Sequence, residues 1–172
     1  MTPGTVRHDD PMKVTHTATY DASLADVHAM LTDPTFRQRA ADASGVVSAE
    51  VTVEATDGGH VVTIDQVQPT EGVPAFAKKF AGDTTRAVVT ETWTSPSSGT
   101  VSIETPGRPT EIHGTYTLAE MGGRTTQTFD GEVTAKVPLI GGKLEKLVTQ
   151  FFVEGRDKEQ AAGAAWLAGD RG

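Results

Sequence analysis

Between residues 46 and 137 the hydrophobic pattern of this sequence repeats every second residue, and after residue 141 it repeats about every 3.6 residues. The first part holds six short runs rich in Thr and Val, a composition typical of strands. The turn segments "TDGG", "TSPSSG" and "MGG" join these runs in pairs. Because such short turns connect antiparallel neighbours, we expect an antiparallel sheet followed by one long helix.

A further strand and two short helices are predicted before this part. Residues 13–20 ("KVTHTATY") alternate as a strand does. Ser23 is a suitable N-cap for a first helix, and Pro34 after an aspartate is typical of the start of a second helix, which we expect to end near Gly45. Three residues of the second helix are expected to face inward: Phe36, Ala40 and Ala43.

The last element is a helix predicted over residues 142–167, after Pro138 has ended the final strand. At about 1.5 Å per residue it is about 40 Å long. Its apolar stripe comprises Leu144, Leu147, Val148, Phe151, Phe152, Gly155, Ala162, Ala165 and Trp166. Most of its charged residues are expected on the solvent side: Lys143, Glu145, Lys146, Glu154, Arg156, Asp157, Lys158 and Glu159.

Seven antiparallel strands in one sheet twist and tend to curl, so one face becomes concave and has to be covered. The C-terminal helix is the only predicted element long and apolar enough to cover it. We therefore expect an α+β fold in which a curved seven-stranded antiparallel sheet wraps around the long C-terminal helix. Two short helices lie between strands 1 and 2, and a cavity is expected between sheet and helix.

Three segments of the chain resemble the helix-grip proteins of the START-like (SRPBCC) superfamily: Met12–Arg39, Gly72–Trp93 and Val137–Ala168. They are most similar to a bacterial branch without an assigned activity, the domain of unknown function 2505. The resemblance implies a helix-grip fold and the binding of an apolar or amphipathic small molecule between sheet and helix. It implies no catalytic residues, because the superfamily has no shared catalytic motif.

Length and composition limit the organisation and the partners. The 172 residues suffice for one domain, and we expect a disordered tail over residues 1–11, a START-like domain over 12–168 and a short tail over 169–172. The net charge of −8 argues against a nucleic-acid partner, because nucleic-acid binding requires a basic surface. No cysteine, signal-like segment or apolar run of membrane-spanning length is present, so we expect a cytoplasmic protein that does not insert into membranes. The oligomeric state is left open, with a homodimer as one option.

Strand alternation assigns the candidate ligand contacts to the inner face of the sheet. Trp93 sets the inner face of its strand and places Glu91 inside, either as a polar anchor for a ligand or paired with an arginine, a backbone amide or water at the rim. The two phenylalanines of segment 69–83 form either a lid over the cavity or a small cluster under a loop. The predicted ligand-binding residues are Glu91, Trp93, Tyr116, Gln127, Phe129, Val148, Phe151, Phe152, Phe76 and Phe80.

Catalytic and cofactor motifs are absent from the sequence. No histidine spacing suits a metal, and no phosphate-binding loop or nucleophile motif occurs, so we expect no metal and no cofactor. A carrier or sensor for a lipid, fatty acid, isoprenoid or polyketide-like molecule is therefore the first hypothesis. The alternatives are a cyclase or dehydratase acting on a polyketide-like substrate, with Glu91, Tyr116 and His16 as acid–base candidates, and a structural protein without a ligand.

Overall fold

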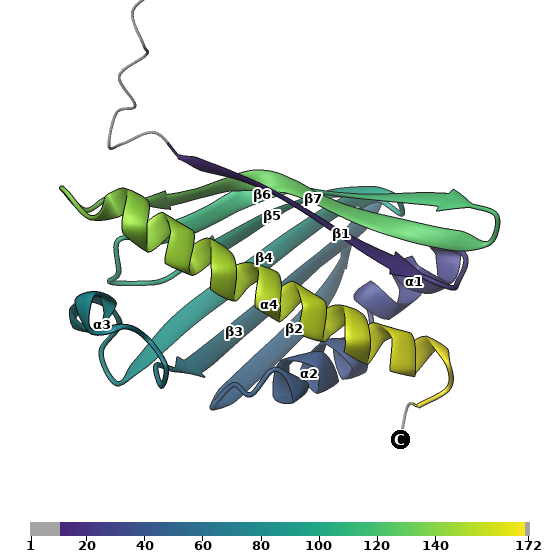
Figure 1. Ribbon diagram of the computed structural model, residues 1–172. Coiled ribbons are helices and arrows are strands. Elements are labelled where there is room, and N and C mark those ends of the chain that lie inside the picture. The colour runs from purple at the N-terminus through teal and green to yellow at the C-terminus, as the bar shows by residue number, and fades with distance from the viewer. Residues whose placement is uncertain (1–10, 171–172) are drawn as a thin grey trace, which may run out of the picture.

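The computed structural model describes residues 11–170, which form one curved sheet and four helices (Figure 1). The elements follow in the order β1 (Met12–Tyr20), α1 (Leu24–Leu31), α2 (Pro34–Ala43), β2 (Ser48–Thr56), β3 (Gly59–Pro69), α3 (Ala75–Ala81), β4 (Thr84–Ser95), β5 (Ser98–Glu104), β6 (Thr110–Met121), β7 (Arg124–Ala135) and α4 (Gly141–Leu167).

The sheet is antiparallel throughout, with the strand order β1-β7-β6-β5-β4-β3-β2. Helix α4 crosses its concave side (Figure 1) and packs against β1 and β7, and also against α1 and α2. Helices α1 and α2 lie near the C-terminal end of α4, whereas α3 lies near its N-terminal end (Figure 1). The predicted helix-grip architecture is confirmed.

Local sequence signals account for the short helices. The Ser23 hydroxyl accepts a hydrogen bond from the Asp26 amide at 3.2 Å and caps α1. In α2 the Asp33 carboxylate caps the helix and Pro34 takes its first position. The expected inner face of α2 was partly wrong, because Ala43 is exposed, and the buried residues are Phe36, Arg37, Ala40 and Ala41.

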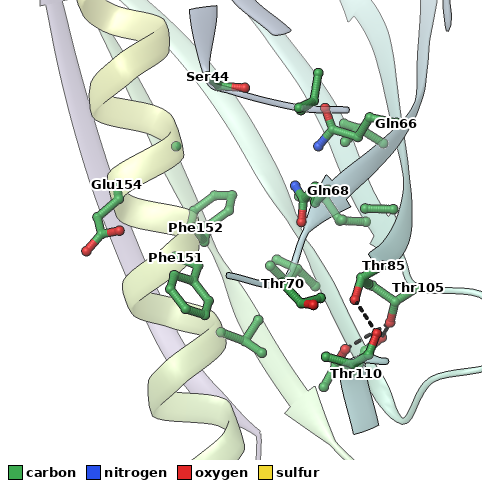
Figure 2. A pocket seen from close by; sticks show the side chains of 18 of the residues that line it. Ser44, Gln66, Gln68, Thr70, Thr85, Thr105, Thr110, Phe151, Phe152 and Glu154 are labelled. Atoms are coloured by element: carbon green, nitrogen blue, oxygen red, sulfur yellow. Dashed lines mark hydrogen bonds between the residues drawn. The ribbon is translucent and has the colours of Figure 1, made fainter. Parts of the chain in front are cut away.

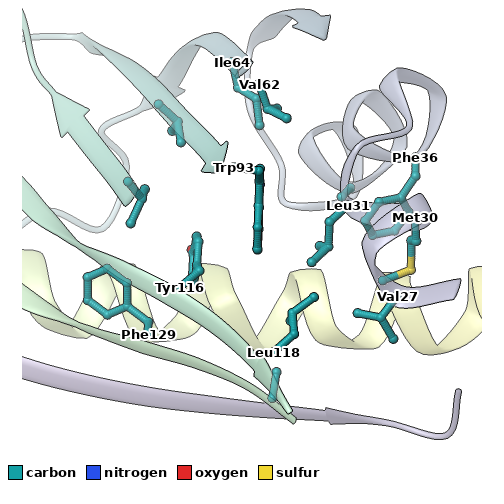
Figure 3. Packing of buried hydrophobic residues seen from close by; sticks show 14 of the residues in the cluster. Val27, Met30, Leu31, Phe36, Val62, Ile64, Trp93, Tyr116, Leu118 and Phe129 are labelled. Carbon is teal, nitrogen blue, oxygen red and sulfur yellow. The ribbon is translucent and has the colours of Figure 1, made fainter. Parts of the chain in front are cut away.

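The core fills the half of the sheet that α1 and α2 cover. Trp93 stands between Leu31 and Tyr116 (Figure 3), and its ring stacks on that of Tyr116 with centroids 6.0 Å apart. The aromatic contacts continue from Tyr116 to Phe129 at 5.6 Å and from Phe129 to Phe152 at 4.7 Å. These rings come from three strands and α4, so they join the sheet to the helix.

Two glycines leave room for one of these rings. Gly114 and Gly131 are paired across β6 and β7. A Cβ on either residue would lie 2.7 Å or 2.6 Å from the Phe129 ring. We expected Gly131 to allow close approach of the helix or a strand bend; in the structure a Cβ there would meet the His113 carbonyl of β6 at 2.3 Å as well as the Phe129 ring.

Two expectations from the sequence concern the ends of the chain and the membrane. Residues 1–10 of the predicted tail, and residues 171–172, lie outside the described part of the chain. Within the described part, no helix is both long and apolar enough to cross a membrane.

Candidate ligand-binding cavity

A cavity of about 470 Å³ lies between α4 and strands β3 to β6. On this concave face, α4 packs against β1 and β7 at one edge of the sheet, and the cavity lies beyond that contact. Residues of α3 and of the loops around it also line the cavity. A sheet that curves around one straight helix thus leaves space on the side away from their contact.

The wall of the cavity is largely apolar and comes from four parts of the fold: α4, the sheet, α3, and α2 with Ala40 and Ala41. Helix α4 contributes Phe151 and Phe152, both labelled in Figure 2. The remaining apolar lining residues include, from α4, Leu144, Leu147 and Val148, from the sheet, Ile64, Ala87, Val89, Ile103 and Ile112, and from α3, Ala77, Phe80 and Ala81. Such a wall suits the hydrocarbon part of a ligand.

Polar side chains line the opposite side, on the strands facing α4 (Figure 2). They are Gln66 and Gln68 of β3, Thr85 of β4, Thr110 of β6, and Thr70 and Thr105 in adjoining loops. The Thr105 hydroxyl lies 2.8 Å from that of Thr110, and the Thr85 hydroxyl donates to the Ala81 carbonyl at 3.0 Å. The cavity is therefore apolar on its helix side and partly polar on its sheet side.

A group of buried charges closes the cavity toward the core. Arg37 and Glu91, each 1% exposed, form a bidentate ion pair. Glu91 also accepts a hydrogen bond from the Trp93 indole nitrogen at 3.0 Å. Glu159 of α4 lies 3.7 Å from Arg37. Three elements, α2, β4 and α4, thus meet through charged side chains at the boundary between the core and the cavity.

Arg156 extends this buried network along α4. Its guanidinium pairs with Glu159 at 2.9 Å and donates to the Tyr116 hydroxyl at 3.0 Å. The buried Nε atoms of Arg37 and Arg156 have no hydrogen-bond partner within residues 11–170. With Glu91, these residues form a network of two cations and two carboxylates, which we call the buried ion network: Arg37, Glu91, Arg156 and Glu159.

The surroundings raise the pKa values of Tyr116 and Arg156 and lower the pKa of Glu159. Burial raises the pKa of Tyr116 to about 12, because loss of water disfavours the phenolate. Burial alone would also raise the pKa of Glu159, but the attraction of Arg156 and Arg37 outweighs it and holds that pKa below its usual value. Burial likewise opposes the charge of Arg156, and Glu159 reverses the effect, so the pKa of Arg156 is raised. These shifts keep both Glu159 and Arg156 charged near neutral pH.

Four of the ten predicted contact residues line the cavity: Phe80, Val148, Phe151 and Phe152. The other six are not among the lining residues. Trp93, Tyr116, Gln127 and Phe129 are buried in the core half, and Glu91 lies in the ion network behind the wall. Phe76 packs against the small cluster that includes the lining residues Ala77 and Leu144, with the Lys143 ammonium 4.5 Å from the centre of its ring. The alternation identified the inner face without showing where along it the cavity lies.

The three acid–base candidates do not line the cavity. Glu91 is engaged by Arg37, and the Tyr116 hydroxyl accepts from Arg156. His16 contacts the exposed Asp157 at 2.9 Å. No group of three or more metal-binding side chains occurs among residues 11–170.

Several important residues were missed or misplaced by the sequence analysis. Arg156 and Glu159 were expected on the solvent side of α4, and the structure corrects this, because their charges are compensated inside by each other and by Arg37. Arg37 was missed altogether. An arginine is rarely buried unless it is paired, and the sequence does not reveal which residue is its partner. Gln66 and Gln68 could have been found, because they continue the inner face of Val62 and Ile64 on β3.

The structure resembles several solved proteins in fold. One is a protein of Thermus thermophilus, 18% identical, covering 92% of this chain and 99% of that chain, with a TM-score of 0.59. Another is the Zhui aromatase/cyclase of Streptomyces sp. R1128, 14% identical, covering 94% of both chains, with a TM-score of 0.55. The norcoclaurine synthase of Thalictrum flavum is 11% identical, covering 98% of this chain and 94% of that chain, with a TM-score of 0.62.

No curated protein matches the sequence. At these identities the solved structures show the shared fold alone, which is the helix-grip fold. A family model matches residues 15–167, from the first strand to the end of α4. The chain therefore belongs to the family described as protein of unknown function (DUF2505).

Proposed function

We propose that this protein binds an apolar or amphipathic small molecule in the cavity between the sheet and α4. The observation that supports this is the cavity itself, since about 470 Å³ falls within the range of roughly 300–1,000 Å³ typical of small-molecule sites. The aromatic and aliphatic wall supplies contacts for a hydrocarbon skeleton such as a lipid, an isoprenoid or a polyketide-like ring system.

Apolar burial supplies enough free energy for useful affinity. Transfer of one methylene group from water contributes about 0.8 kcal/mol. Eight to ten buried methylene groups thus contribute roughly 6–8 kcal/mol, from which the costs of association are subtracted. Micromolar binding therefore requires no charged anchor.

Filling the cavity tests the proposal. Ala87 is buried on the inner face of β4 and lines the cavity, so Ala87→Phe places a ring in the space for the ligand. We expect the unaltered protein to bind the fluorescent hydrocarbon diphenylhexatriene with micromolar affinity, and Ala87→Phe to weaken this binding at least about tenfold.

The matched control is Ala119→Phe, because Ala119 is exposed on the outer face of β6. It adds the same ring outside the cavity and should leave probe binding unchanged. Equal binding by both variants would contradict the assignment of the cavity. Native mass spectrometry of the protein as isolated from cells reports any bound ligand directly.

A further inference from the structure

One arginine of the cavity lining has no partner within the described chain. Arg108 lies in the loop between β5 and β6 and is half-buried. Its guanidinium forms no ion pair and no hydrogen bond with another group of residues 11–170. The two interior cations of the lining, Arg37 and Arg156, are already paired with Glu91 and Glu159. Of these three arginines, Arg108 is the one that remains available to a ligand.

The position of this guanidinium is set by the glycine that ends α3. A Cβ on Gly82 would lie 2.7 Å from the Nη2 atom of Arg108 and 3.7 Å from its Cζ atom. Gly82 also has a φ of +65°, so glycine suits both its backbone and the close approach. The arginine therefore lies at the end of the cavity where β3 ends at Pro69 and β4 begins at Thr84.

The hydroxyl groups at the same end of the cavity are engaged within the protein. They belong to four threonines, labelled in Figure 2: Thr70, Thr85, Thr105 and Thr110. Thr70, Thr85 and Thr105 each donate to a backbone carbonyl, and the Thr110 hydroxyl lies 2.8 Å from that of Thr105. The guanidinium thus supplies the N–H donors at this end, and a group rich in acceptor oxygens is its natural partner.

The carboxylates of the lining leave the charge of Arg108 uncompensated. They are Glu71, Glu111, Glu154 and Glu159. Glu159 belongs to the buried ion network, and Glu111 contacts His113 at 3.3 Å and Lys136 at 3.8 Å. The other two are exposed. A half-buried arginine without a partner gains from a carboxylate, because the planar fork of the guanidinium matches its two oxygens.

An apolar path leads inward from this end of the cavity along β4. The inner face of the strand presents Thr85, Ala87 and Val89, and then Glu91 of the ion network. At about 3.3 Å per residue, Thr85 and Glu91 are about 20 Å apart along the strand. The two neighbouring phenylalanines of α4 line the opposite side (Figure 2). A ligand whose head lies at Arg108 would therefore have its tail among apolar side chains.

We infer that the cavity binds an amphipathic carboxylic acid in its anionic form, with the carboxylate on Arg108 and the hydrocarbon part along Ala87 and Val89. This rests on the proposed function and adds to it the head group of the ligand and the orientation in which it binds. One unpaired arginine matches one negative charge, so a monoanionic carboxylate suits the site better than a dianion.

Displacement of diphenylhexatriene at neutral pH by decanoate and by 1-decanol tests the role of Arg108. Arg108→Met removes the charge and keeps an apolar stem. We expect this variant to bind decanoate at least about tenfold more weakly, and to bind 1-decanol and diphenylhexatriene within about twofold of the unaltered protein. Unchanged binding of diphenylhexatriene also shows that the variant is folded. An unchanged affinity for decanoate, or an equal loss for 1-decanol, would overturn the inference.

The matched control is Lys146→Met. Lys146 is exposed on the N-terminal half of α4 and is not among the lining residues, so the variant removes one positive charge outside the cavity. Its affinity for decanoate should stay within about twofold of that of the unaltered protein. A loss as large as that of Arg108→Met would mean that general attraction, and not contact with Arg108, holds the acid, and the inference would be wrong.

Reversing the charge tests the orientation of the ligand. In Arg108→Glu we expect decylamine to bind at least about threefold more tightly than it binds to the unaltered protein, because the new carboxylate attracts its ammonium group. Without such a gain, the head group does not lie at Arg108 and the inference fails.

The outcomes separate the two proposals. If diphenylhexatriene binds and the affinity for decanoate does not depend on Arg108, the inference is wrong while cavity binding stands. If diphenylhexatriene, 1-decanol and decanoate all fail to bind, the proposed function fails and the inference fails with it.

Discussion

Arg37 and Glu91 separate a filled half of the molecule from a hollow one. Both side chains are 1% exposed, and each needs the other because a buried charge without a partner is strongly unfavourable. Glu91 was expected either to anchor a ligand or to pair with an arginine, and the structure shows it paired. Glu91 also accepts a hydrogen bond from the Trp93 indole, so the pair helps to hold this core ring in place.

Breaking this pair should destabilise the protein more than replacing both partners. Arg37→Met leaves Glu91 and Glu159 buried beside an apolar side chain, and we expect the free energy of unfolding to fall by about 3–5 kcal/mol. Arg37→Met combined with Glu91→Gln should recover part of that loss, with a coupling of roughly 1–3 kcal/mol in a double-mutant cycle measured by urea denaturation.

The exposed pair of Arg86 and Asp65 provides the control for this cycle. Its atoms approach to 2.7 Å, but the side chains are 55% and 33% exposed. Arg86→Met should therefore change stability little. Strict additivity of Arg37→Met and Glu91→Gln would show that the buried pair is not coupled.

At the scale of elements, the position of α4 depends on one close approach. A Cβ at Gly163 would lie 2.7 Å from the buried ring of Tyr20 and 3.1 Å from Met30. Glycine at this position lets α4 lie against β1 and α1. Gly155 lies two turns earlier in the same helix, where a Cβ would meet nothing within 4 Å. The two glycines thus have the same intrinsic effect on the helix and different surroundings.

Alanine at these two positions should have opposite effects. Gly155→Ala should raise the free energy of unfolding by up to about 1 kcal/mol, because alanine favours the helix. Gly163→Ala should lower it, since the rigid Tyr20 ring has to move and the helix gain is lost. Thermal unfolding of both variants measures the difference. A stabilising Gly163→Ala would show that the contact between α4 and β1 is looser than the structure indicates.

At the scale of the whole molecule, the buried ion network makes stability depend on pH. Arg156 and Arg37 hold the pKa of Glu159 below its usual value of 4.5. A carboxylate with a lowered pKa in the folded state stabilises the protein above its unfolded pKa. That contribution is lost as the pH falls through the lowered folded value.

We therefore expect the free energy of unfolding to decline below about pH 4.5, with a shallower decline in Glu159→Gln. Urea denaturation between about pH 7 and about pH 3 measures both slopes. Glu154→Gln serves as the control, because Glu154 is exposed on the same helix and should leave the slope unchanged. Identical slopes for Glu159→Gln and the unaltered protein would contradict the role of Glu159.

The sequence by itself determined the order of the strands and of α1, α2 and α4, the antiparallel hairpins, and the inner face of β4. These features depend on local signals: the period of the hydrophobic residues, the caps of α1 and α2, and short turns such as "TDGG". Such signals act within a few residues, so one sequence is enough to read them. The inner face that includes Trp93, Glu91 and Ala87 was predicted in this way.

Only the tertiary structure decided which inner residues fill the core and which enclose the cavity. Alternation shows that Phe129 and Gln66 both point inward, but the distance from each to α4 depends on how the sheet curves around the helix. The inward turn of Arg156 and Glu159 likewise depends on Arg37, which is distant in sequence. A buried charge is stable only where its partner lies, and the folded chain alone brings the partners together.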